Sequence, residues 1–127
     1  MEIKHSLDTL EIYHIAMEIG DSVWNEVMKW DYFTKKTVGT QFVKAADSIA
    51  ANISEGYGRY TFKDSNRFFH ISRGSILETK TWLTKATNRK LLGKPFAQQL
   101  ATKLDILHQK LNGYVRFLKN SDERNQG

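Results

Sequence analysis

The stretch KAADSIAANISEGYGR, residues 44–59, decides the fold of this chain because it joins a helical stripe of small residues to an abrupt glycine stop. Apolar side chains recur at helical spacing at Ala45, Ala46, Ile49 and Ile53. Small residues at Ser48, Ala51 and Ser54 leave the other faces shallow enough for a second backbone to approach. The sequence therefore predicts a helix that packs closely on more than one side.

Two glycines are predicted to end this helix. Gly56 and Gly58 follow its last apolar residue, and glycine tolerates the left-handed conformation that commonly closes a helix. Glu55 precedes Arg59 by four residues, which is the favourable order for an ion pair along one helix face. We expect this pair to form if the last helical turn reaches Arg59.

Capping signals mark three further helices. The four helices are expected over about residues 9–30, 35–56, 62–88 and 95–119. Asp8 and Glu11 have the spacing of a capping box at the start of the first helix, and Thr34 is the expected N-cap of the second. Thr61 begins a Thr-x-x-Asp pattern before the third helix, and Pro95 suits the first turn of the fourth.

Apolar stripes on these helices predict a bundle. The first two stripes are Ile12, Ile15, Ala16, Ile19, Val23 and Val27, and Val38, Phe42, Ala45, Ala46, Ile49 and Ile53. The fourth helix has the spacing of a coiled-coil seam at Phe96, Leu100, Leu104, Leu107, Leu111, Tyr114 and Leu118. Similar helix lengths and short links favour an all-α, antiparallel up-and-down four-helix bundle over residues 1–120. The polar residues 121–127 are expected to form a disordered tail.

The third helix carries more apolar surface than one bundle needs. One row, spaced by seven, is Phe62, Phe69, Ile76 and Leu83, and a second row is Phe68, Ile71, Ser75 and Trp82. The second row either widens the core or meets a neighbouring chain. Gly74 lies in mid-helix, where glycine costs about 1 kcal/mol relative to alanine, and close approach of another helix is a common reason to keep one.

Composition limits the class of protein. A chain of 127 residues is one domain by size, and the absence of cysteine excludes disulfides, thiolate nucleophiles and cysteine zinc sites. The N-terminal residues lack the apolar run of a signal peptide, and no stretch reaches the length of a membrane span. We therefore expect a soluble, cytoplasmic protein with no membrane partner.

Charge is distributed unevenly along the chain. Residues 1–33 hold seven acids and two lysines, whereas residues 34–127 hold seventeen Lys or Arg and seven acids. Such a division serves attraction within the fold, attraction between subunits, or the binding of a polyanion by the basic part. Solvated surface charge is the plainest alternative.

The residues present do not fit the common kinds of enzyme site. A di-iron bundle needs Glu-x-x-His pairs and further Glu residues aimed inward, for which the candidates are Glu11 with His14, Asp105 with His108, Glu55 and Glu78. On a helical wheel, His14 and Asp105 point away from their apolar stripes, so no metal site is expected. The Gly56-Tyr57-Gly58 run lacks the third glycine and the strand of a dinucleotide site. We expect no catalytic residue, no cofactor and no small-molecule substrate.

The motif residues resemble those of a known family. SIAANISEGYGR, preceded by Gly39, Gln41 and Ala45-Ala46 and followed by Arg67-Phe68, Gly74-Ser75 and Glu78, is similar to the pattern of the four-helix proteins called 23S ribosomal RNA intervening-sequence proteins. The similarity covers nearly the whole chain. Ala50 stands where many members have proline, and Lys80 stands where many have a second acid, which argues against a role that needs paired acids on the third helix.

The resemblance implies a left-handed up-and-down bundle that assembles into rings, typically of five chains. It also implies association with nucleic acid, usually proposed to be RNA, without an established activity. A related group accompanies reverse transcriptases, so a structural or adaptor ring that binds a protein partner is the alternative. The expected protein is thus a non-enzymatic homo-oligomer, a pentamer by resemblance.

Two sets of candidate site residues follow. The expected nucleic-acid contacts are Arg59, Lys63, Arg67, Lys85, Arg89, Lys90, Lys94, Lys103 and Lys110. The expected structural motif and subunit interface comprises Ser48, Asn52, Glu55, Gly56, Ile71, Gly74, Ser75, Glu78 and Trp82. Tyr57 and Tyr60 either stack bases or pack across the glycine turn.

Overall fold

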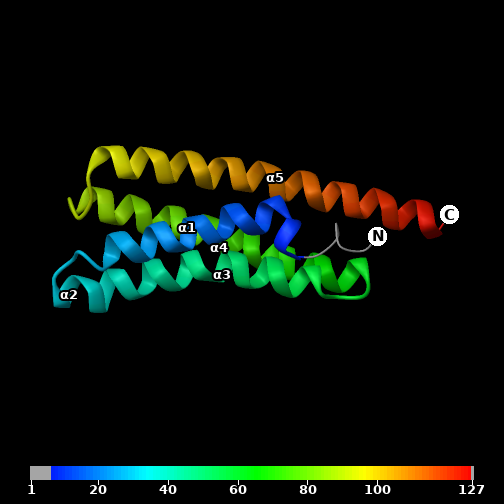
Figure 1. The fold of residues 1–127 in the computed structure, drawn as a ribbon, viewed down its shortest axis with the longest axis horizontal. Helices are drawn as coiled ribbons and strands as arrows, with labels where there is room; N and C mark the ends of the chain where they lie inside the picture. The colour runs from blue at the N-terminus through cyan, green and yellow to red at the C-terminus, as the bar shows by residue number, and fades with distance from the viewer. Residues whose placement is uncertain (1–6, 127) are drawn as a thin grey trace.

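The computed structural model describes residues 7–126, and every regular element in that range is helical. The elements are η2 (Leu7–Thr9), α1 (Glu11–Val27), α2 (Tyr32–Thr34), η3 (Lys35–Gly39), α3 (Thr40–Tyr57), α4 (Phe62–Asn88) and α5 (Lys94–Gln126). The long helices α1, α3, α4 and α5 run alternately up and down, and each packs against the next around the bundle (Figure 1). The prediction of an all-α, antiparallel four-helix bundle is therefore confirmed. Residues 1–6 and 127, which fall within the predicted domain and tail, lie outside the described range.

The core is formed by the predicted stripes. Buried residues from the four long helices include Ile12, Ala16, Ile19, Val23, Phe42, Ala46, Ile49, Ile53, Phe69, Ile76, Leu83, Leu100, Leu104, Leu107 and Leu111. Trp30 also lies in this core, where its ring stacks on Phe42 at a centroid distance of 6.4 Å. The described helices include none with the length and apolar character needed to cross a lipid bilayer.

The start of α1 differs from its prediction. Its N-cap is Leu10, which makes no side-chain capping bond, and Asp8 lies instead in the preceding 3-10 turn η2. The prediction of a capping box formed by Asp8 and Glu11 is therefore wrong. The α-helix also ends at Val27, before the buried Trp30, because the chain turns there toward α2.

The second helical rod begins three residues earlier than predicted. Asp31 is its N-cap, and its carboxylate accepts a hydrogen bond of 2.9 Å from the Thr34 amide, so Thr34 lies inside the rod. This hydrogen bond holds the pKa of Asp31 below its usual 3.8. The rod continues through the π-helical turn η3 into α3. Thr37 and Thr40 stabilise the wide turn, since their hydroxyls donate to the carbonyls of Phe33 and Lys36 at 2.8 Å.

The turn between α3 and α4 closes without a left-handed glycine. Gly58 is the C-cap with φ −83° and ψ −3°, so the prediction of left-handed closure is wrong. Gly56 serves close packing instead, because a Cβ atom there would lie 2.7 Å from Cε1 of Phe69 on α4. The N-cap of α4 is Thr61, whose hydroxyl accepts from the Asp64 amide at 3.2 Å, as predicted.

The last two helices end differently. At the end of α4, Lys90 has φ 59°, and the amides of Lys90 and Leu91 donate to Thr87 and Ala86 in a Schellman arrangement. Helix α5 continues to Gln126 and projects past the α3–α4 turn (Figure 1). The disordered tail predicted for residues 121–127 is therefore replaced by helix as far as Gln126. Ser121 and Asp122 line a cavity together with residues of the α3–α4 turn.

Candidate nucleic-acid interface

Helix α1 neutralises two of the predicted nucleic-acid contacts. Lys110 of α5 pairs with Glu11 at 3.3 Å, and Lys103 pairs with Glu18 at 3.9 Å. The acidic first third of the chain thus attracts the basic remainder within one fold, which was one of the three alternatives for the uneven charge. Because these lysines already face carboxylates, they offer less to a phosphate than a free cation does.

The α3–α4 turn holds a second group of predicted contacts. The guanidinium groups of Arg59 and Arg67 lie 4.5 and 5.0 Å from the ring centroid of Phe68. Arg59 also pairs with Glu55 at 3.4 Å, as predicted, and Arg67 lies 3.9 Å from Asp64. Phe68, from the second apolar row of α4, therefore serves as a platform for two cations rather than as a core side chain.

The tyrosines of this turn divide between the two expected uses. Tyr60 is fully exposed, whereas Tyr57 is half-buried and lies near Tyr114 in the cavity between the turn and α5. Burial raises the pKa of Tyr114 above its usual 10.0, and Tyr57 adds to that shift. Tyr57 thus packs across the glycine turn, and Tyr60 is free to contact a ligand. Lys63 is exposed beside them and has no ion pair among residues 7–126.

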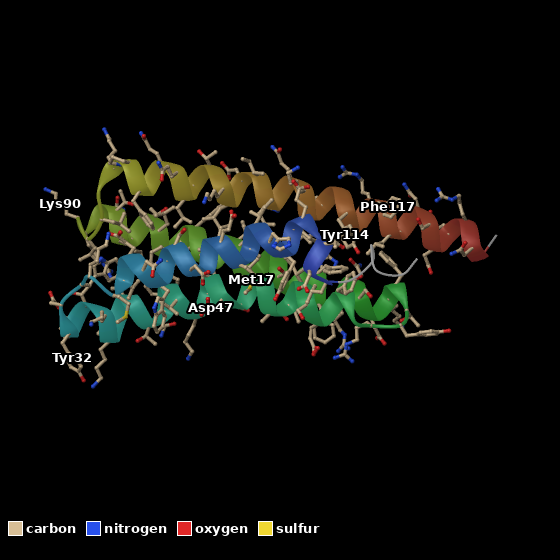
Figure 2. The ribbon with its side chains drawn as sticks, in the orientation of Figure 1. Met17, Tyr32, Asp47, Lys90, Tyr114 and Phe117 are labelled. Carbon is tan, nitrogen blue, oxygen red and sulfur yellow. The ribbon has the colours of Figure 1, made fainter. Side chains whose placement is uncertain are left out.

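The remaining predicted cations gather at the opposite end of the bundle. Arg89, Lys90 and Lys94 flank the loop from α4 to α5, are exposed, and form no ion pair with any described residue. Figure 2 shows Lys90 and Tyr32 at this same end, both pointing away from the bundle. The last predicted contact, Lys85, lies in the final turn of α4, and its ammonium is 5.9 Å from the Trp82 ring.

Three residues at this end were missed by the sequence reasoning. Tyr32 and Phe33 form the first turn of the rod and are 74% and 73% exposed, and the Lys36 ammonium lies 5.7 Å from the Tyr32 ring. We call this surface the α2 end; it comprises Tyr32, Phe33, Lys36, Arg89, Lys90 and Lys94. The pair of adjacent aromatic residues directly after the helix-capping Asp31 was the signal that could have identified it.

Part of the predicted structural motif joins α3 to α4. The Ser75 hydroxyl donates to Ser48 Oγ at 2.9 Å, and Asn52 donates to the same oxygen at 2.9 Å. Nearby, buried Ser72 donates to the Ile49 carbonyl at 2.9 Å. These bonds lie within one chain, so Ser48, Asn52 and Ser75 fix two neighbouring helices.

On α4, Ile71, Gly74 and Glu78 of that motif are exposed, whereas Trp82 is partly buried and packs against the core. Glu78 accepts a long hydrogen bond of 3.4 Å from the Trp82 ring within the same helix. Ile71 is 47% exposed, and a Cβ atom added at Gly74 would meet no atom within 4 Å. No helix of this chain thus requires a glycine at position 74.

A groove between α1 and α3 carries acids and exposed apolar side chains. It encloses about 680 Å³, and its lining includes Met17, Asp21, Asp47 and Glu55. Burial, with a contribution from the charge of Asp21, raises the pKa of Asp47 above its usual 3.8. Toward the α2 end, a second hollow between the same helices is lined by Trp24 and Met28, which are about half exposed, and we include it in the surface named next. We call this surface the α1/α3 groove.

The groups considered for a di-iron site are engaged elsewhere. Asp105 pairs with Lys80 at 2.6 Å, and Glu11 pairs with Lys110. Burial and the neighbouring charges of Lys80 and Arg73 lower the pKa of His108, and the charge of Asp105 partly offsets that decrease. Within residues 7–126, no three His, Cys, Asp or Glu side chains lie close enough together to hold one metal ion.

Comparison with known proteins bears directly on the motif. The family model of the 23S rRNA-intervening sequence protein matches residues 8–113. The bundle is also similar to the crystal structure of a protein of unknown function from the S23 ribosomal protein family of Bacteroides thetaiotaomicron. The TM-score is 0.74 at 16% sequence identity, over 82% of this chain and 97% of the other. No curated protein matches. Because the family model spans most of the chain, this protein belongs to the 23S rRNA-intervening sequence protein family.

Proposed function

We propose that this protein is a non-enzymatic, ring-forming homo-oligomer that associates with RNA through basic outer surfaces. The observation that carries the proposal is the separation of its cations into two classes. Those that face α1 are paired with carboxylates, whereas Lys63, Arg89, Lys90 and Lys94 have no such partner among the described residues. Unpaired cations at exposed positions are the groups that exchange condensed counterions when a protein binds a nucleic acid.

Two unlike surfaces support assembly into a ring. The α1/α3 groove presents Met17, Trp24 and Met28 beside the acids Asp21 and Asp47. The outer face of α4 presents Ile71 and Leu77 around Gly74. A contact between two different surfaces of the same protein is heterologous, and it closes into a ring when the rotation between copies allows. Five chains is the number suggested by the family resemblance. The open space beside Gly74 is of the kind that lets another helix approach closely.

Assembly would multiply the basic surface. The chain carries a formal net charge of +5, and a ring repeats the unpaired cations of each copy around one axis. Because each neutralised phosphate adds to the free energy of binding, several modest basic patches bind a polyanion more tightly than one patch does. We place this role in the cytoplasm, where ribosomal RNA is found.

Filter retention of a single-stranded RNA across a salt series tests this proposal. If Lys63, Arg89, Lys90 and Lys94 each neutralise one phosphate, the affinity should fall roughly 50-fold between about 50 and 200 mM salt. Retention that is absent at low salt, or that does not change with salt, contradicts the proposal. If the protein sediments as a single chain, the proposed ring is contradicted.

An adaptor that binds a protein partner, such as a reverse transcriptase or another nucleic-acid enzyme, is the second candidate. The α1/α3 groove favours it, because grooves lined by methionine and tryptophan are common docking sites for amphipathic helices. Asp21 and Asp47 pair with no cation among residues 7–126, and their charges would select a basic partner helix. Salt-independent recovery of one protein with this chain from its host cells, without RNA, would favour the adaptor.

A further inference from the structure

The α2 end combines exposed aromatic rings with free cations. Tyr32 and Phe33 are adjacent in the sequence and are 74% and 73% exposed, so neither ring contributes to the core of this chain. The core at this end is completed by Trp30, which is buried and stacks on Phe42. The two exposed rings are therefore surplus to the packing of the bundle, and they are available to a ligand.

Cations share this end of the bundle with the two rings. The Lys36 ammonium lies 5.7 Å from the Tyr32 ring, one helical turn away on the same rod. The nearest acid in the sequence, Asp31, uses its carboxylate to cap the rod. Across the same bundle end, Arg89, Lys90 and Lys94 extend the positive surface. A ligand for the α2 end is thus expected to be anionic and to present flat faces.

The backbone conformation of Lys90 indicates that positive charge at the α2 end is important. It has φ 59°, a conformation that disfavours residues with a Cβ atom and that glycine adopts readily. It is also exposed, so its side chain does not pack in the core. A lysine at a position that suits glycine places a cation at the tip of the loop at the expense of backbone strain.

We propose that the α2 end binds an unpaired segment of RNA, with bases stacked on Tyr32 and Phe33 and phosphates beside the four cations. This inference rests on the proposed function and narrows it to single strands. Bases in a duplex are stacked on each other, whereas unpaired bases are free to lie on an aromatic side chain. The combination of rings and separated cations therefore fits a single strand better than a duplex.

Other occupants fit this surface less well. Binding to a membrane surface grows with the apolar area that enters the lipid, and here only two side chains of a three-residue helix project. A second copy of the chain would bring its own cations to this end, where they would repel those already present. The acidic α1/α3 groove of a second copy could attract these cations, but in the proposed ring that groove is covered by the outer face of α4.

The test is fluorescence anisotropy of a labelled short oligouridylate titrated with the full-length protein at low salt. The variant Tyr32→Ala/Phe33→Ala should bind roughly 5- to 150-fold more weakly for each stacked base that is lost. The control Phe117→Ala also removes an exposed ring, on α5, and should bind as the unaltered protein does. A duplex of the same length should bind the unaltered protein more weakly than the single strand, and should distinguish the two variants little.

Each outcome decides between alternatives. Equal affinity of the Tyr32→Ala/Phe33→Ala variant and the unaltered protein overturns this inference but leaves the proposed function intact. An effect confined to the Phe117→Ala variant assigns base stacking to another ring and also overturns it. A change in sedimenting mass of the first variant assigns the rings to contact between copies. If the unaltered protein binds no RNA at low salt, the proposed function and this inference fail together.

Crosslinking provides a second measurement that does not depend on a variant. An oligonucleotide that contains photoreactive uridine should crosslink to the peptide that includes Tyr32 and Phe33. Crosslinks confined to the α3–α4 turn, beside Arg59 and Tyr60, would place the RNA at the opposite end of the bundle and overturn the inference.

Discussion

The substitution Gly56→Ala tests why α3 lies so close to α4. The added Cβ atom would lie 2.7 Å from Cε1 of Phe69 and 3.0 Å from the Ser65 carbonyl oxygen. Neither neighbour yields easily, because Phe69 is fully buried against the edge of the Tyr114 ring and the Ser65 oxygen belongs to the backbone. Overpacking of this kind costs about 1–3 kcal/mol. The gain in helix propensity is at most about 1 kcal/mol and is smaller in a last turn, so a net loss of about 1–2 kcal/mol remains.

Urea denaturation followed by circular dichroism, with all variants at the same protein concentration, measures this loss in the free energy of unfolding. In thermal denaturation, at an unfolding entropy of about 2.1 cal/mol/K per residue, the melting temperature should fall by about 4–8 °C. Gly113→Ala is the matched control, since its added Cβ atom would meet only the end of the Arg116 side chain at 3.8 Å and should stabilise α5. Our explanation of the helix contact is refuted if Gly56→Ala proves as stable as Gly113→Ala.

Three further substitutions test separate parts of the account. Gly74→Ala, which meets nothing within this chain, should weaken self-association in sedimentation equilibrium, and an unchanged oligomer would remove Gly74 from the interface. Lys90→Gly should raise the free energy of unfolding by about 0.5–1 kcal/mol by relieving the left-handed lysine, while it weakens RNA binding; a less stable variant contradicts the strain argument. Asp47→Asn should stabilise the fold at neutral pH, because the raised pKa of Asp47 means that its charged form opposes folding. That gain should disappear as the pH falls below 3.8 in urea titrations, and a gain that persists in acid would contradict this explanation.

The helices and the core were predictable from the sequence because they depend on local patterns. The stripe from Ile12 to Val27 and the row of Phe69, Ile76 and Leu83 face the core as their spacing indicates. The Thr61 cap was also found, since a single threonine there precedes the apolar residues of α4. By contrast, Thr34 was predicted as the cap of the second helix, and Asp31, an equally good capping residue three positions earlier, caps it instead.

The site was less predictable because it depends on which helices are neighbours. Lys103 and Lys110 have the spacing of an exposed basic row, but the antiparallel packing of α5 on α1 brings them to Glu18 and Glu11. Gly56 resembles a helix stop in the sequence, and only the position of Phe69 on α4 reveals its steric role. The exposure of Tyr32 likewise follows from Trp30 having filled the core at that end.

The salt dependence of RNA affinity, compared between two double variants, tests the central claim most directly. We expect the slope of log affinity against log salt concentration to become shallower by about 1.4 in Lys90→Gln/Lys94→Gln, because each of these cations neutralises one phosphate of a single strand. The slope should change little in Lys103→Gln/Lys110→Gln, whose lysines face the carboxylates of α1. Equal changes of slope in the two variants, or none in the first, would contradict the account.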